Sequence, residues 1–467
     1  MSMKWAQHLT LGAATVALAV ALSACGSSNA ADPTPGGGNG GSGSSSSTAS
    51  SDASFVQPTL VTLDPAYLAI TKQRLQSSNF ADAELKPAWD TLKAAADKAL
   101  TATPETVMNK KVAPPSGDMH DYISRGPYWW PNPATPDGKP YIRKDGQTNP
   151  DSKNADYTDA NRKGTMINAA QNLGLAYYFT GDAKYAKQAA EVIRTWFLKP
   201  ETRMNPNLRF GQAIIGVVDG RGTGLIDMAD MWRVIDSVAL IAPSGELTNS
   251  EVTALRKWYS DFANWMVNST TGHEENVWHN NHGSYYDAQL AAYYLFVGDR
   301  ESARRVIYDA QTRRVTAQIA TTGKMYMELE RTRPFHYSAY NLIALQLIAR
   351  YAEQVNTADM PTAANDDSCA AFPQYRCKID LWNLEIDARG IKRAIDYLSN
   401  VAATTAPANW EFKGTEETSY PLNELLPILL QAERAYKTGA YATVLRNYVD
   451  TDSKTKTALD RLLWPLQ

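Results

Sequence analysis

Apolar side chains recur every three or four residues through most of the chain after residue 54. Trp89, Leu92, Ala96 and Leu100 show this spacing, which is typical of a helix with one buried face. Long alternations of Val, Ile and Thr, the usual signature of strands, are scarce. The pattern therefore predicts an all-α fold.

A pattern of helix, tight turn and helix occurs twice in similar form. Ala-Tyr-Tyr leads into a Gly-Asp turn at 176–182, and the same signals recur at 292–299. Each turn introduces a second helical segment, over 185–197 and 302–313. Further hairpin-like segments lie at 342–354, 384–401 and 422–438. Repeated helical hairpins of this kind predict a solenoid or a closed α/α toroid.

The region 114–159 is dense in Gly, Pro, Asn and Asp and breaks the helical pattern. Prolines on both sides of its Tyr-Trp-Trp sequence exclude a regular helix there. A long irregular loop with adjacent aromatic side chains is more often a binding loop than a spacer, and a purely structural plug is the alternative. The candidate ligand-binding residues of this region are Arg125, Tyr128, Trp129, Trp130 and Arg143.

The first 25 residues have the features of an export signal. Lys4 precedes an apolar run from Leu9 to Leu22, which is too short for a membrane-spanning helix of about 20 residues. The following Leu-Ser-Ala-Cys sequence resembles a bacterial lipoprotein signal, which implies that cleavage leaves Cys25 as the lipidated first residue. A plain secretory signal is the alternative. Either one predicts an exported protein, periplasmic or held at the outer membrane by its lipid.

Residues 26–54 contain no large apolar side chain. Such a stretch cannot bury enough surface to offset the entropy of ordering, which predicts a flexible Gly/Ser-rich linker before a folded domain at 55–467. Two further cysteines, Cys369 and Cys377, lie in a polar loop. In an oxidising compartment they are expected to form a disulfide, with metal ligation or free thiols as alternatives.

Composition narrows the possible partners. The chain has 467 residues, with 46 Lys and Arg against 49 Asp and Glu, so its formal charge is only -3. This argues against a nucleic-acid-binding protein, which usually carries a clustered basic surplus. The 12 Trp and 24 Tyr residues can line a sugar groove as well as fill a core, because their rings are amphipathic.

Three of the six histidines lie close together, at His273, His279 and His282. Clustered imidazoles often bind zinc, but this segment lacks the His-Glu-x-x-His pattern, and no Cys pair completes a tetrahedral set. The sequence therefore favours a site that works without a metal or another cofactor.

Four residues in and after this cluster suit one reaction. Asn281 and His282 are adjacent, while Arg333, Tyr337 and Tyr340 are four and three residues apart, a spacing that places them on one face of a helix. An amide, an imidazole, a guanidinium and a phenol can together cleave a 1,4-linked uronate by β-elimination. The alternative is a structural role for each residue.

β-Elimination removes the proton beside the uronate carboxylate, and the carboxylate charge must be neutralised for this. Asn281 as an amide donor and Arg333 as a cation are expected to do so, as an oxyanion hole does. His282 is the expected base, and Tyr340 is expected to donate a proton to the leaving oxygen O4. The nearby guanidinium should lower the pKa of the Tyr340 phenol. Where proton and leaving oxygen share one face of the sugar, Tyr340 can serve both steps.

These segments resemble the alginate lyase family, polysaccharide lyase family five. Asn280 to Tyr285 is similar to its Asn-Asn-His segment, and Arg333 to Tyr340 has its Arg-to-Tyr spacing. The Gly-Pro-Tyr-Trp-Trp-Pro loop resembles the broader alginate-lyase-like group that includes polysaccharide lyase family thirty-eight. The resemblance implies an (α/α) toroid of six or seven helical hairpins with a central cleft or tunnel. It also assigns catalysis to the four residues above, with no obligatory metal.

The residues beside these motifs, Trp278, His336 and Tyr337, are expected to bind substrate. The aromatic loop is not part of the family-five pattern, so the polyuronate stays open between alginate, polymannuronate and glucuronan. A glycoside hydrolase on the same toroid is the second hypothesis, and it would need two carboxylates from among Glu328, Glu330, Asp227 and Asp287. A non-catalytic glycan-binding lipoprotein is the third, and it would need only the aromatic loop.

Overall fold

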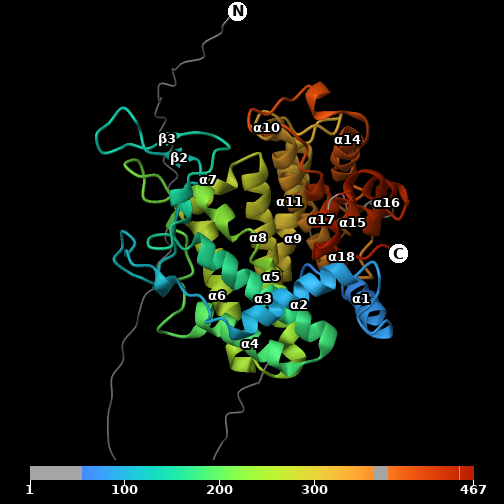
Figure 1. Cartoon of the computed structure of the whole chain (residues 1–467), viewed down its shortest axis with the longest axis horizontal. Coiled ribbons are helices and arrows are strands. Elements are labelled where there is room, and N and C mark those ends of the chain that lie inside the picture. The colour runs from blue at the N-terminus through green and yellow to red at the C-terminus, as the bar shows by residue number, and fades with distance from the viewer. Residues whose placement is uncertain (1–54, 362–376, 452) are drawn as a thin grey trace, which may run out of the picture. The chain divides into compact units, whose positions relative to one another are not determined.

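The structure is a computed structural model that describes residues 55–361, 377–451 and 453–467, all within the compact unit Phe55–Gln467. Helices dominate this unit, as the apolar spacing predicts (Figure 1). The signal at 1–25 with Cys25, the linker at 26–54, and Cys369 lie outside the described residues. Cys377 is buried and disulfide-bonded.

The elements of the N-terminal part alternate long helices with short 3-10 and π-helical turns. In chain order they are α1 (Pro65–Ser77), α2 (Lys86–Thr101), η1 (Val107–Asn109), η2 (Pro150–Lys153), α3 (Ala160–Thr180), α4 (Ala183–Ile193), η3 (Arg194–Leu198), η4 (Gly222–Met228), α5 (Trp232–Ile241) and η5 (Ala242–Ser244). The predicted helix around Trp89 is α2, and its buried face carries Trp89, Leu92 and Ala96.

The remaining helices follow in two groups. The central group consists of α6 (Asn249–Asn268), α7 (Thr270–Asn276), α8 (Asn281–Val297), α9 (Arg300–Ala310), η6 (Gln311–Thr316), α10 (Tyr326–Leu329) and α11 (Pro334–Val355). The C-terminal group consists of α14 (Ile391–Thr404), η7 (Pro407–Asn409), η8 (Leu422–Glu424), α15 (Leu425–Tyr436), α16 (Ala440–Val444), η9 (Leu445–Val449), α17 (Ser453–Lys456) and α18 (Asp460–Leu463).

The two predicted Gly-Asp turns are confirmed. Gly181 ends α3 with a φ of 76°, and the side chain of Asp182 caps α4 by accepting from the backbone N of Lys184 at 3.2 Å. Gly298 ends α8 with a φ of 89°, and Asp299 caps α9 in the same way. Glycine reaches this left-handed conformation without steric cost, and Asp satisfies free N–H groups of the next helix. Each turn therefore reverses the chain into an antiparallel helix pair.

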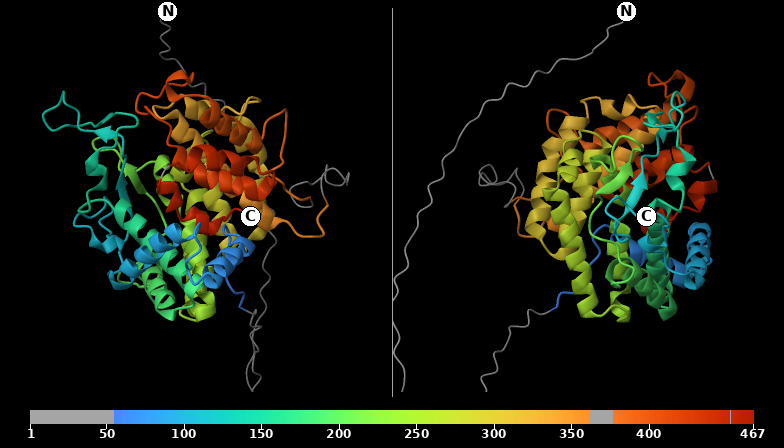
Figure 2. Two further views of the ribbon diagram at one scale, coloured as in Figure 1. Left: turned by 45° about the vertical axis from the view of Figure 1, so that its right-hand side comes forward. Right: turned by 90° about the vertical axis from the view of Figure 1, so that its left-hand side faces the viewer.

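The irregular region 114–159 contains most of the strand structure. Strand β1 (Ile123–Arg125) pairs in parallel with β4 (Phe210–Ala213), and β2 (Trp129–Trp130) pairs antiparallel with β3 (Ile142–Arg143). Trp129 lies opposite Arg143, and Trp130 opposite Ile142. The β2–β3 hairpin extends from the helical body (Figures 1 and 2). Because successive strand residues point to opposite faces, the two tryptophans cannot face the same space.

The long helices α8 and α11 lie side by side in the core (Figure 1). About three quarters of their residues are buried, which is typical of a helix surrounded by other elements. Asn281 and His282 begin α8, while Tyr337 and Tyr340 lie in the first two turns of α11. The packing of these two helices therefore places the predicted chemistry in one region. Within the described ranges, no helix is long and apolar enough to cross a membrane.

A half-buried ion pair predicts how the stability of the fold depends on pH. The Arg194 guanidinium, 2.5 Å from Glu251, lowers the pKa of that carboxyl to about 2 from an ordinary 4.5, and Thr248 N–H also donates to it. A lowered pKa stabilises the folded state above pH 4.5, and this contribution is lost as the pH falls toward 2. Glu251→Gln should lower the free energy of unfolding by about 1 to 2 kcal/mol at neutral pH.

Urea unfolding of both proteins at a series of pH values measures this difference. The gap between wild type and Glu251→Gln should narrow as the pH falls from 4.5 to about 2. Glu301→Gln is the control, because Glu301 pairs with Arg305 on the exposed surface and contributes little. A gap that stays constant across this range would refute the assignment.

Candidate active site

A cavity of about 820 Å³ lies at the N-terminal ends of α8 and α11, where the β2–β3 hairpin meets them. Its walls come from four segments of the chain. The lining residues are Pro127, Tyr128, Trp129, Arg143, Asp145, Gln212, Arg221, Thr223, Ile226, Trp278, Asn280, Asn281, His282, Met327, Glu330, Arg331, His336, Tyr337 and Tyr340.

The cavity collects most of the residues that the sequence singles out. Those on its wall are Tyr128, Trp129, Arg143, Trp278, Asn281, His282, His336, Tyr337 and Tyr340. Three others are not on its wall: Arg125, Trp130 and Arg333.

Arg125 on β1 and Trp130 on β2 are both turned away from the cavity. The Arg125 guanidinium lies 3.4 Å from the ring centroid of Tyr157, outside the cavity. The indole N–H of Trp130 donates to the backbone oxygen of Gln147 at 2.9 Å. Trp129 takes the cavity side of β2, so strand alternation places Trp130 on the other face. The expectation that both tryptophans face the substrate is corrected accordingly.

Arg333 is also corrected, and the reason is where the helix begins. Pro334 is the first residue of α11, and Arg333 before it has φ -131° and ψ 71°, which is not helical. Arg333 caps the helix, with its carbonyl accepting from the backbone N of Tyr337 at 3.0 Å, and its side chain does not line the cavity with those of Tyr337 and Tyr340. The charge of Arg333 acts on Glu417, where it opposes the rise in pKa that burial causes. The arginine on the cavity wall is Arg331, two residues earlier.

His282 is held by a carboxylate that the sequence analysis missed. Its Nδ1 lies 2.6 Å from Oε1 of Glu275, which is only 1% exposed. Burial raises the pKa of Glu275, and the contact with His282 opposes this rise. A carboxylate on Nδ1 fixes the ring and favours the tautomer whose Nε2 is unprotonated. The second imidazole nitrogen is thereby kept available as a base.

Asn281 lies on the cavity wall and is anchored by a buried carboxylate. Its Nδ2 donates to both oxygens of Glu328, at 3.0 and 2.9 Å, and its backbone N donates to Oε1 at 2.6 Å. Glu328 is buried, and burial raises its pKa while these donors lower it. One N–H of the Asn281 amide therefore anchors the start of α8 on α10, and its second N–H, which points away from that carboxylate, is available on the cavity wall.

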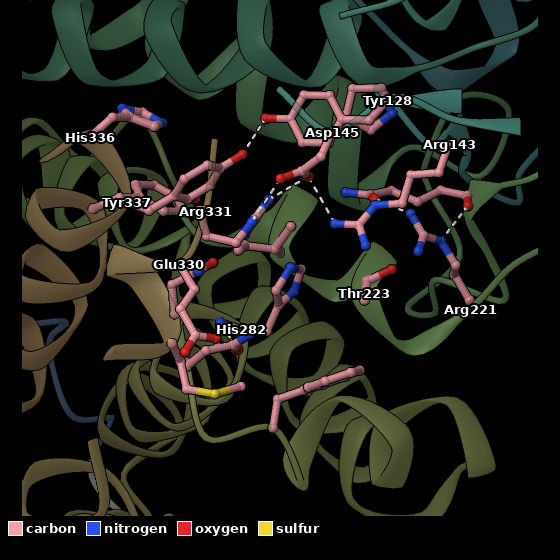
Figure 3. A pocket seen from close by; sticks show the side chains of 18 of the residues that line it. Tyr128, Arg143, Asp145, Arg221, Thr223, His282, Glu330, Arg331, His336 and Tyr337 are labelled. Carbon is pink, nitrogen blue, oxygen red and sulfur yellow. Dashed lines mark hydrogen bonds and ion pairs between the residues drawn. The ribbon is translucent and has the colours of Figure 1, made fainter. Parts of the chain in front are cut away.

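The phenol of Tyr337 and the guanidinium of Arg331 lie next to each other on the cavity wall (Figure 3). The Tyr337 hydroxyl lies 2.6 Å from that of Tyr128, and the Arg331 guanidinium lies 3.7 Å from the Tyr337 ring centroid. Burial raises the pKa of Tyr337, and Arg331 opposes this rise. Arg331 also donates to both oxygens of Asp145, at 3.1 and 2.9 Å, and Arg143 donates to Oδ1 of the same carboxylate. The hairpin is thus tied to the wall that carries the phenol.

Tyr340 also lies on the cavity wall, and its phenol is paired with another phenol. Its hydroxyl hydrogen-bonds that of Tyr285, and the two rings are 4.5 Å apart. Burial raises its pKa well above the ordinary value, and the charges of Asp230 and Asp227 add to the rise. The expected lowering of this pKa is therefore wrong, because burial and the two carboxylates raise it.

The carboxylates considered for a hydrolase do not form a pair in the cavity. Asp287 is buried in an ion pair with Arg314 at 2.8 Å, and Glu328 holds Asn281. Asp227 accepts hydrogen bonds from Tyr122 and Gln212. Of the four candidates only Glu330 lines the cavity. Inverting or retaining hydrolysis needs two carboxylates that flank the scissile bond. In the ranges that the structure covers, no group of His, Cys, Asp and Glu is arranged to hold a metal ion.

Known proteins resemble this chain in sequence and in fold. A family model described as alginate lyase matches residues 106–368. The crystal structure of an alginate lyase from Bacteroides ovatus is 34% identical, with a TM-score of 0.77 over 88% of this chain and 100% of that one. Alginate lyase A1-III from Sphingomonas species A1 is 14% identical, with a TM-score of 0.51 over 89% and 98% of the two chains. A search of curated proteins finds no match.

The similar structures are alginate lyases with the (α/α) toroid fold, which confirms the predicted architecture. The family model spans more than half of the chain, and the Bacteroides ovatus enzyme aligns over its whole length. The protein therefore belongs to the alginate lyase family and is a polysaccharide lyase.

Proposed function

We propose that this lyase cleaves a 1,4-linked polyuronate by β-elimination and leaves 4,5-unsaturated uronate ends. One observation carries the proposal: a single cavity brings together the imidazole of His282, the guanidinium of Arg331 and the phenol of Tyr337. The similarity to alginate lyases supports a uronate substrate, and the arrangement supplies each group that the reaction needs.

The first requirement is neutralisation of the uronate carboxylate. The proton on C5 is too weakly acidic to remove while the adjacent carboxylate keeps its full charge. The Arg331 guanidinium lies 3.7 Å from the Tyr337 ring centroid. Its Nε and Nη2 hold Asp145, and its Nη1 makes no hydrogen bond among the described residues, so it can donate to a substrate carboxylate. Stabilising the charge that develops in the transition state is commonly the largest contribution to catalysis. Arg331 takes the role that the sequence analysis gave to Arg333.

The second requirement is the transfer of two protons. His282 takes the proton from C5, because Glu275 on its Nδ1 keeps Nε2 free and stabilises the imidazolium that forms. Tyr337 donates a proton to O4 as the C4–O4 bond breaks and the C4=C5 double bond forms. Where the C5 proton and O4 lie on one face of the sugar, Tyr337 serves both steps. The hydrogen bond to Tyr128 holds its hydroxyl in place.

Aromatic side chains supply the walls that hold the sugar rings. Tyr128, Trp129 and Trp278 line the cavity, and Trp278 is 40% exposed, which is unusual for so large an apolar side chain. Flat aromatic rings pack against the apolar faces of sugars, while the cationic groups bind the carboxylates. This combination supports an anionic polysaccharide as the substrate, and not a neutral one.

A substrate panel tests the proposal. The chain without residues 1–54, which retains the whole compact unit, is incubated with alginate, polymannuronate, polyguluronate and glucuronan. The ultraviolet absorbance of unsaturated ends should rise on at least one of these polymers. Absence of the signal on all four, with the protein folded, would exclude the proposal.

We also propose that the chain is exported and anchored by a lipid on Cys25, and this rests on the sequence of residues 1–25 alone. Cells expressing the full chain with a labelled fatty acid should incorporate label into the protein. Cys25→Ala should abolish the label and release the protein from the membrane fraction. Labelling that survives this substitution would show that the lipid is attached elsewhere. A wild type that takes up no label would contradict the proposed anchor.

A further inference from the structure

Arg221 is a cation of the cavity that the reaction outlined above does not use. It is half-buried on the cavity wall, and in the described part of the chain no carboxylate lies within ion-pair distance of it. By contrast, Arg143 and Arg331 share Asp145. The charges of Glu275, Asp227 and Glu274 act on Arg221 only from beyond ion-pair distance. A guanidinium that is partly removed from water without a direct ion pair is costly, and an anionic ligand would relieve that cost.

The guanidinium of Arg221 is held in one orientation. Its Nε donates to the backbone oxygen of Gln212 at 3.0 Å, and Nη2 donates to the side-chain Oε1 of the same residue at 2.9 Å. Nη1 makes no hydrogen bond within the ranges that the structure covers. Two of the three nitrogens therefore fix the group, and the third stays available for a ligand.

The residue that holds Arg221 is itself in an unusual conformation. Gln212 has a φ of 48°, a left-handed region that non-glycine residues rarely adopt. Its backbone N donates to Ser124 Oγ at 2.8 Å, and its Nε2 donates to Asp227 at 3.2 Å. Strained backbone of this kind persists where the surroundings fix it, and it occurs often at ligand sites. The strain here serves to position Arg221.

Thr223 adds a second donor beside Arg221. Its Oγ1 is buried and has no hydrogen-bond partner among the described residues, yet Thr223 lines the cavity. The segment that carries both residues is fixed by close packing, because a Cβ on Gly224 would lie 2.5 Å from the backbone of Gly211. A buried hydroxyl without a partner usually awaits a ligand or a water.

Arg221 and Arg331 lie on different sides of the cavity. Figure 3 shows Arg331 beside Tyr337, and Arg221 at the opposite side beyond Arg143 and Thr223. One sugar carboxylate at the phenol is therefore served by Arg331, and Arg221 faces another position along the glycan. The ring of Trp129, 5.9 Å from the Arg221 guanidinium, supplies an apolar wall at that position.

We propose that Arg221 and Thr223 bind the carboxylate of the uronate next to the one that reacts. The enzyme then recognises the negative charge of two neighbouring sugars of its substrate. This inference rests on the proposed function and refines its substrate class. The preferred substrate is a polymer in which consecutive sugars are uronates, and a glycan in which neutral sugars separate the uronates is a poor one.

The test uses the full chain and two forms of one polyuronate that the wild type cleaves. One form is intact, and in the other about half of the carboxyl groups have been reduced to alcohols. The wild type should prefer the intact form in kcat/KM. Arg221→Gln should lower kcat/KM on the intact form by about 10- to 100-fold, mainly through KM, and should reduce the preference to the roughly twofold that remains because half of the reactive uronates are lost. Thr223→Val should show the same change at about one tenth of the size.

Arg209→Gln is the matched control, because Arg209 is exposed and lies outside the cavity wall. It should keep the wild-type preference. If Arg221→Gln fails to fold, Arg221→Lys replaces it, and a raised KM with kcat retained supports the proposal. An Arg221 variant that keeps the full preference, or that loses only kcat on both forms, overturns it. A wild type that yields no unsaturated ends on any polyuronate is a different result, the failure of the proposed function itself.

Discussion

Replacing Tyr337 with phenylalanine should lower kcat about 1000-fold. The change removes one oxygen, and with it the proton that we assign to the leaving O4 and the hydrogen bond to Tyr128 at 2.6 Å. General acid–base catalysis commonly contributes about 10² to 10⁴-fold to a rate. The ring itself stays, so the contact with Arg331 and the packing of α11 are kept. KM should change little, as measured by initial rates of unsaturated-end formation.

Tyr340→Phe is the matched control for this result. It makes the same chemical change on the same helix, at a phenol whose partner is Tyr285. We expect its kcat to stay within about tenfold of the wild type. If Tyr340→Phe is the variant that loses turnover while Tyr337→Phe keeps it, the proton-transfer role belongs to Tyr340, and our assignment fails.

Arg331→Gln should lower kcat/KM by about 10² to 10³-fold, since removing one preorganised donor to a developing oxyanion typically costs that much. Kinetics on a uronate oligomer of defined length measure the loss. Arg333→Gln, two residues away and off the cavity wall, should stay within a few-fold of the wild type. Both substitutions remove one positive charge near the start of α11. A difference in kcat/KM between the two variants therefore reports where the cation lies and not the loss of charge alone.

Arg331→Gln also leaves Asp145 with one arginine partner fewer. Asp145→Asn separates this effect from catalysis, since it breaks the same ion pair and keeps the Arg331 charge. We expect Asp145→Asn to lose much less activity than Arg331→Gln. Equal losses in these two variants would show that the ion pair, and not the cation, accounts for the effect.

The helical architecture could be predicted because its signals are local. The Gly-Asp turns after 180 and 297 place a left-handed glycine and a helix-capping carboxylate at consecutive positions. These residues dictate the reversal without help from the rest of the chain. The closure of the hairpins into a toroid rested on resemblance, since periodicity alone is also compatible with an open solenoid.

The candidate site was predicted less completely because helix phase depends on where a helix begins. Arg333 is four residues from Tyr337, but Pro334 starts the helix, so the spacing rule does not apply across that boundary. Arg331 then reaches the cavity from an irregular turn, which has no periodic signal. His282 was identified, whereas Glu275 was not, since α7 and α8 are separate helices whose contact depends on the turn between them.

The hairpin shows the same limit for strands. Adjacent tryptophans in a Pro-rich loop indicate binding, but only the strand pairing decides which one faces the cavity. Asp145 and Arg221 come from segments far apart in the sequence and meet the helices through long-range packing. Their positions follow from tertiary structure, which no local pattern encodes.

Mass spectrometry of the products from a defined oligouronate shows directly whether the glycosidic bond is broken by elimination or by hydrolysis. Elimination by His282 and Tyr337 gives new non-reducing ends that lack one water relative to hydrolysis. We predict that the wild type forms only these unsaturated ends, and that Tyr337→Phe forms almost none. Saturated ends from the wild type, or unsaturated ends from Tyr337→Phe at the wild-type rate, would contradict the account.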